Sequence, residues 1–154
     1  MNKFFIYAIA LTAVIACNNG DKKTTSNENV VTTPADSLMK DIETGHDQAM
    51  SKMGKLGTMQ KKLQLVLDSI ATLPAKTQQT AEPYKRKLDS ILEDLKSAKD
   101  NMMKWMDEFN MDSAVNDLQQ RINYLTGEKL KIAKVKESMV SSLQKADSLI
   151  KATF

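Results

Sequence analysis

Apolar residues recur at alternating steps of three and four over most of the chain after Asp36, and this spacing is typical of α-helices. A stripe of this kind buries one side of each helix. Glycine (5) and proline (3) are scarce, which argues against an all-β fold with many tight turns. We therefore expect an all-α domain over residues 36–154, built as an antiparallel three-helix bundle or coiled coil.

The first helix is expected over about residues 37–72, with Asp36 or Ser37 as its N-terminal cap. Gly54 and Gly57 lie inside it and indicate a weak or closely packed stretch. The expected stripe consists of Met39, Ile42, His46, Ala49, Met53, Leu56, Gln60, Leu63, Leu67 and Ile70.

The second helix is expected over about residues 83–110, because Pro83 suits a first helical turn and the polar segment 75–82 suits a connection. The third is expected over about 113–152, after a short turn that ends in a cap at Ser113. The second stripe is Tyr84, Leu88, Ile91, Leu95, Ala98, Met102, Trp105 and Phe109. The third is Leu118, Leu125, Ile132, Met139 and Ala146, interleaved with Val115, Ile122, Leu143 and Ile150.

These bounds make the third helix roughly 60 Å long and the second roughly 40 Å. The C-terminal half of the third helix is therefore expected to need a partner surface. The alternative architecture is an extended coiled coil that completes its core by pairing two copies of the chain through this helix.

The N-terminus has the pattern of a signal peptide, with Lys3 before an uncharged apolar run that is too short to span a bilayer. The sequence Val14-Ile15-Ala16-Cys17 resembles the lipobox of bacterial lipoproteins. This resemblance implies cleavage between Ala16 and Cys17, which leaves residues 1–16 as the signal peptide. It also implies a diacylglyceryl thioether on the Cys17 thiol and a further acyl chain, such as palmitate, on its amine. The alternative is an ordinary secretory signal with a chance cysteine.

Residues 17–35 are expected to be the acylated Cys17 followed by a disordered tether, because the segment is polar and lacks helical periodicity. Lipidation would anchor the chain effectively permanently in a membrane of the cell envelope. Asn18 resembles the outer-membrane sorting pattern of enteric bacteria, so the outer membrane is the expected location. Whether the domain faces the periplasm or the cell surface stays open.

Methionine is abundant (10 residues), and several methionines gather around the single histidine. Antiparallel pairing of the first two helices is expected to bring His46 level with Phe109 and Met50 level with Trp105. A cluster of thioethers with one imidazole suits Cu(I) or Ag(I), as in periplasmic copper chaperones that use a similar ligand set. The candidate metal residues are His46, Met50, Met53, Met102 and Met106, with Trp105 beside them. The alternatives are that these methionines are core filler or line a groove for a partner protein.

The segments around these residues resemble small helical lipoproteins of Bacteroidetes-type bacteria, which are often mislabelled "viral A-type inclusion protein". The matching residues are His46-Asp47, Met50, Lys52-Met53-Gly54, Met102-Met103-Lys104-Trp105-Met106 and Phe109. The resemblance covers the lipobox and about residues 46–109. It implies the location and the helical fold and brings no established activity.

No catalytic motif is present, and a single histidine and a single cysteine leave few candidates for a nucleophile or a hydrolytic metal site. The net charge of +3 comes from interspersed acids and bases, so no nucleic-acid partner is expected. The sequence predicts a non-catalytic binding or structural module of the envelope that needs no cofactor. Its partner would be another envelope protein, and the alternative function is Cu(I) binding.

Overall fold

The computed structural model of the chain describes residues 32–152, which form three α-helices and no strand. The helices are α1 (Pro34–Ala71), α2 (Ala75–Glu108) and α3 (Leu118–Lys151). The expected all-α class and the number of helices are confirmed for this part of the chain. The expected signal peptide, Cys17 and residues 18–31 of the expected tether lie outside the described residues.

α1 begins earlier than the sequence predicts because its cap is Thr33 rather than Asp36 or Ser37. The Thr33 hydroxyl accepts a hydrogen bond from the Asp36 amide (3.1 Å), and the Asp36 carboxylate accepts one from the Thr33 amide (2.9 Å). Such a reciprocal pair satisfies two amides that a bare helix end would leave unpaired. Pro34 follows at the first helical position, so the last residues of the expected tether are helical.

α2 begins at Ala75, and the expected polar connection over 75–82 is wrong. Pro74 rather than Pro83 precedes the helix, and its carbonyl accepts hydrogen bonds from the Thr77 and Gln78 amides at 2.8 and 3.0 Å. Residues 72–74 alone join α1 to α2. Pro83 is exposed inside α2, where the helix continues through it.

α3 begins at Leu118 rather than at residue 113, after a loop over residues 109–117. Its cap is Asp117, which accepts a hydrogen bond from the Gln120 amide (3.0 Å), rather than Ser113. Ala114 has a left-handed backbone (φ 55°), which a right-handed helix cannot include. This residue therefore prevents the helix from starting where the sequence predicts.

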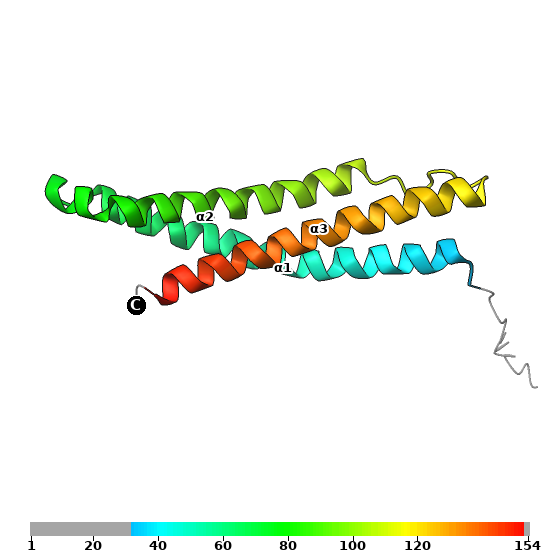
Figure 1. Cartoon of the computed structure of the whole chain (residues 1–154), viewed down its shortest axis with the longest axis horizontal. Coiled ribbons are helices and arrows are strands. Elements are labelled where there is room, and N and C mark those ends of the chain that lie inside the picture. Colours follow the sequence, from blue (N-terminus) through cyan, green and yellow to red (C-terminus); the bar gives the residue numbers. More distant parts are fainter. Residues whose placement is uncertain (1–31, 153–154) are drawn as a thin grey trace, which may run out of the picture. The chain divides into compact units, whose positions relative to one another are not determined.

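The helices run up, down and up along a common direction (Figure 1). Lys129 pairs with Asp41 and Lys55 with Asp147, so residue numbers rise together along α1 and α3. Along α2 and α3 the numbers run in opposite senses, because Asp94 pairs with Lys145 and Trp105 with Glu128. α2 is thus antiparallel to both other helices.

The predicted stripes form the core, with differences at the ends and on the flanks. Leu118 and Val115 are exposed, because the helix that was expected to carry them inward begins only at residue 118. Met59, Leu92 and Glu128 are buried although they lie outside the predicted stripes. The fully buried large side chains are Ile42, Leu56, Leu63, Leu88, Leu95, Met102, Leu125, Ile132 and Met139.

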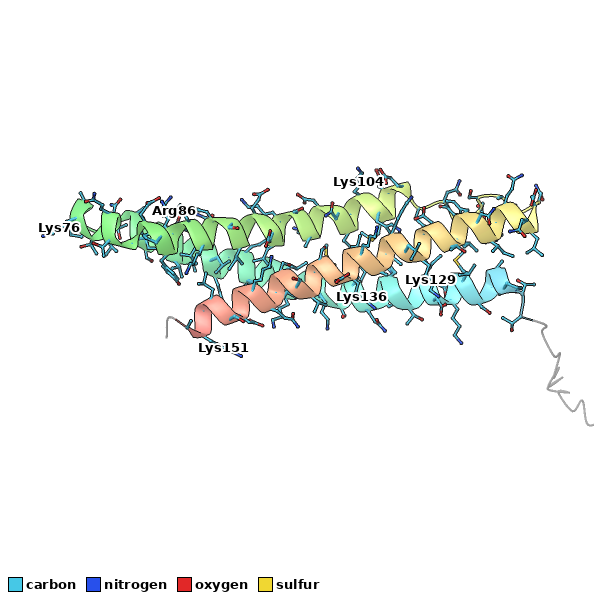
Figure 2. All side chains as sticks on the ribbon, viewed as in Figure 1. Lys76, Arg86, Lys104, Lys129, Lys136 and Lys151 are labelled. Atoms are coloured by element: carbon cyan, nitrogen blue, oxygen red, sulfur yellow. The ribbon has the colours of Figure 1, made fainter. Side chains whose placement is uncertain are left out.

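The hairpin of α1 and α2 extends past the end of α3 (Figure 1), and α3 is not longer than α2 as the sequence predicts. α2 and α3 have 34 residues each, about 51 Å, and α1 has 38, about 57 Å. The C-terminal end of α3 lies against α2, where Leu149 and Ala152 line a pocket with Lys87 and Ile91. Lys76 lies on the part of α2 beyond the end of α3, and Arg86 lies about level with that end (Figure 2). The expectation of a partner surface along α3 rested on α3 being longer than α2, and the two helices have equal length.

Candidate functional site

A pocket of about 510 Å³ opens where α1 begins and α2 ends. Its walls come from α1, from α2 and from the 109–117 loop. Most of the lining is apolar, with an imidazole and two carboxylates among it. The lining residues are Met39, Ile42, Glu43, His46, Asp47, Trp105, Met106, Phe109 and Met111.

A row of four rings crosses the bundle beside this pocket. The ring centroids of His46 and Trp105 lie 5.9 Å apart, and those of Trp105 and Phe109 lie 5.0 Å apart with an interplanar angle of 23°. Phe109 also stacks on Tyr124 of α3, at 6.3 Å. The row joins all three helices, and the rings of His46 and Phe109 both lie against the buried Trp105.

Trp105 is fixed from α3 by a buried hydrogen bond. Its indole Nε1–H donates to the Glu128 carboxylate at 2.9 Å. The other oxygen of that carboxylate accepts from the Lys131 ammonium at 2.8 Å. The same hydrogen bond and charge raise the pKa of Lys131. The buried carboxylate therefore has a partner on each oxygen, as a buried charge requires.

The loop beside the pocket is also held in place. The Arg121 guanidinium donates to the carbonyls of Met111 (3.0 Å) and Ser113 (2.9 Å). The Asn110 amide donates to the Tyr124 hydroxyl at 2.7 Å. These bonds keep Met111 at the pocket although its own side chain is exposed.

The polar groups of the pocket are acidic apart from the histidine. His46 Nδ1 lies 3.0 Å from a carboxylate oxygen of Asp47, and the His46 side chain is one-third exposed. Glu43 is exposed at the same rim, and among residues 32–152 neither a lysine nor an arginine lines the pocket. The site therefore combines an imidazole, thioethers and aromatic rings with two carboxylates that favour a cation.

The structure brings only part of the predicted metal cluster together. His46, Trp105 and Met106 line the pocket, whereas Met50 and Met53 do not. Met102 is fully buried in the core. The difference arises because the turn lies at 72–74, so that His46 meets Trp105 instead of Phe109.

Sequence reasoning missed three features of the site. Met39 is seven residues before His46 and so on the same face of α1, a signal that could have indicated it. Met111 reaches the pocket through the loop conformation, which the sequence pattern does not encode. Glu128 lies at helical spacing between the buried Leu125 and Ile132, but its charge predicts an exposed position and its partner is 23 residues away in the chain.

Two further findings concern residues 32–152. In this part of the chain no three His, Cys, Asp or Glu side chains lie together as metal ligands. None of the helices described is both long and apolar enough to cross a membrane. Ala16 and Cys17, the predicted cleavage and lipidation residues, lie outside the described range.

Comparison with protein-family models, with curated proteins and with solved structures finds no match to this chain.

Proposed function

We propose that this chain is a lipid-anchored protein of the cell envelope that acts as a non-catalytic helical binding module. The pocket around His46 and Trp105 would be its binding site. The observation that carries the proposal is the way the pocket is built. Its volume of about 510 Å³ and its mostly apolar lining with a few polar groups are typical of small-ligand sites.

Interactions within the chain support a preformed site. The pocket walls are held in place by contacts that involve all three helices. These contacts are the ring row from His46 to Tyr124 and the Trp105–Glu128 hydrogen bond. Binding to such a site costs little ordering of the protein.

The anchoring part of the proposal is supported by the sequence. The lipobox-like Val14-Ile15-Ala16-Cys17, the polar segment after it and the resemblance to small helical lipoproteins all agree with acylation of Cys17. Asn18 favours the outer membrane. A tether that reaches Pro34 would enter the helical unit at the pocket end, because α1 begins there shortly before Met39.

Anchoring can be tested by expressing the full chain in bacteria with labelled palmitate. The wild type is expected to incorporate the label, to be cleaved before Cys17 and to sediment with the outer membrane. Cys17→Ala is expected to lose both the label and the cleavage. Cleavage of the wild type without label would instead identify an ordinary secretory signal and contradict the lipid anchor.

The pocket can be tested with the full chain in detergent by NMR of its methionine methyl groups. A small-molecule extract of the cell envelope is expected to shift the methyl signals of Met39 and Met106 but not that of the exposed Met103. Glu43→Trp would fill the pocket mouth and remove these shifts, whereas Glu137→Trp, on an exposed site of α3 outside the pocket, would not. Equal shifts in both variants would contradict the assignment.

A further inference from the structure

The orientation of His46 leaves one ring nitrogen free for a ligand. Nδ1 lies 3.0 Å from the Asp47 carboxylate, and because an ionised carboxylate can only accept, this contact favours the tautomer with the hydrogen on Nδ1. In the neutral ring, Nε2 then has the lone pair. A carboxylate that orients a histidine in this way is the usual outer partner of a metal-bound imidazole.

Three thioethers line the same pocket, each from a different segment. Met39 comes from α1, Met106 from α2 and Met111 from the 109–117 loop. Met39 and Met106 are half-buried against the core, and Met111 is exposed at the mouth. Thioether sulfur is a neutral, polarisable donor, and together with imidazole it selects soft monovalent ions over hard cations.

The surroundings favour a metal ion over an organic cation. An organic cation would be held over an open aromatic face, and the ring of Trp105 is already partly covered by the rings of His46 and Phe109. The carboxylates of Glu43 and Asp47 add negative charge at the rim, which attracts any cation. Among residues 32–152 no three His, Cys, Asp or Glu side chains form a cluster, so a borderline ion such as Zn²⁺ lacks its ligands.

We infer that the pocket binds a soft monovalent metal ion, Cu(I) or Ag(I), through His46 Nε2 and the thioethers of Met39 and Met106, with Met111 as a further donor at its mouth. The inference rests on the proposed function, because it names the ligand class of that same pocket. It assigns a ligand set different from the one that helical spacing predicts. Met50, Met53 and Met102 would not be ligands, since they do not line the pocket and Met102 is fully buried.

The test is a titration of the full chain in detergent with silver nitrate in chloride-free buffer. Quenching of Trp105, the single tryptophan, reports an ion near the pocket. The methionine methyl signals in NMR report which thioethers bind. Met39→Leu/Met106→Leu removes two proposed ligands at nearly constant volume. Met50→Leu/Met53→Leu is the matched control for the spacing-based set, and circular dichroism confirms that each variant is helical.

The expected result is quenching that saturates at a single equivalent, with shifts of the Met39, Met106 and Met111 methyl groups. Met39→Leu/Met106→Leu and His46→Leu would abolish saturation, and Met50→Leu/Met53→Leu would leave it unchanged. Asp47→Asn would weaken Ag(I) binding about tenfold or more, because a neutral amide orients the imidazole less strongly than a carboxylate and adds no negative charge.

Two results would overturn the inference. If saturation depends on Met50 and Met53 instead, the ion binds the face predicted from spacing and not the pocket. If the folded wild type shows no saturable quenching, the pocket is not a soft-metal site. The second result leaves the anchored binding module standing, because palmitate labelling and the envelope-extract shifts test that proposal without Ag(I).

Discussion

The indole Nε1–H of Trp105 donates a 2.9 Å hydrogen bond to the carboxylate of Glu128, and this bond ties α2 to α3 next to the pocket. Both residues are buried. The carboxylate also accepts from Lys131, so the charge of Glu128 has a hydrogen-bond partner on each side. The carboxylate can be buried here because both of its oxygens have hydrogen-bond partners. It also supplies the acceptor that the buried indole N–H needs.

Replacing Glu128 by leucine is expected to lower the free energy of unfolding by about 1–3 kcal/mol, because the buried indole N–H would lose its acceptor. Glu128→Gln keeps an acceptor and is expected to cost less. Urea unfolding followed by circular dichroism measures both. Glu137→Leu, at an exposed position of the same helix, should change stability by less than about 0.5 kcal/mol. Equal stability of Glu128→Leu and this control would contradict the role of the hydrogen bond.

The glycines of α1 are expected to respond differently to alanine. A Cβ on Gly54 meets no atom within 4 Å among the described residues, so Gly54→Ala should stabilise the chain by about 1 kcal/mol through helix propensity. A Cβ on Gly45 would lie 3.3 Å from Cγ2 of Ile132, so that part or all of this gain is lost. Thermal unfolding of the two variants checks the difference. Equal stabilisation would show that α1 and α3 are free to move apart at Gly45.

The helical stripes could be predicted because burial follows the period of the helix. Ile42, Leu56 and Leu63 are fully buried, as their spacing predicts. Close packing is harder to predict, since it depends on the facing helix. The sequence predicts a weak or closely packed stretch at Gly54, whereas the close approach lies at Gly45, opposite Ile132.

The helix ends and the register could not be predicted for a related reason. Pro74 and Pro83 both suit the start of a helix, and the stripe alone does not choose between them. Choosing Pro83 moves the turn along the chain and places His46 opposite Phe109 instead of Trp105. The region of the pocket could therefore be predicted from the sequence, whereas the residues that line it depend on the register.

The hairpin segment beyond α3 is expected to open more readily than the rest of the bundle, because only two helices pack there. Peptides around Leu67 and Ala81 should exchange their amide hydrogens at least about tenfold faster than peptides around Leu56 and Leu95. A tenfold difference in exchange corresponds to about 1.4 kcal/mol in the free energy of opening. Hydrogen exchange with mass spectrometry measures this. Uniform protection along α1 and α2 would indicate that something covers the hairpin tip in solution.

The first turn of α1 is expected to loosen in acid. The side-chain hydrogen bond with Thr33, and then the bond from its backbone amide, hold the pKa of Asp36 below its usual range. A lowered pKa in the folded chain means that the ionised carboxylate stabilises the helix end above the pKa of an unfolded aspartate, about 4. That stabilisation is lost as the pH falls through the lowered folded value.

NMR of the Thr33 amide between about pH 6 and pH 2 is the measurement, because this amide donates to the Asp36 carboxylate. Its signal should titrate with a midpoint below about pH 4, and exchange of the first helical amides should rise at the same pH. In Asp36→Asn the side chain cannot ionise, so the Thr33 signal should lose this titration. A midpoint at or above the ordinary value, or an unchanged titration in the variant, would show that the capping box does not favour the ionised form.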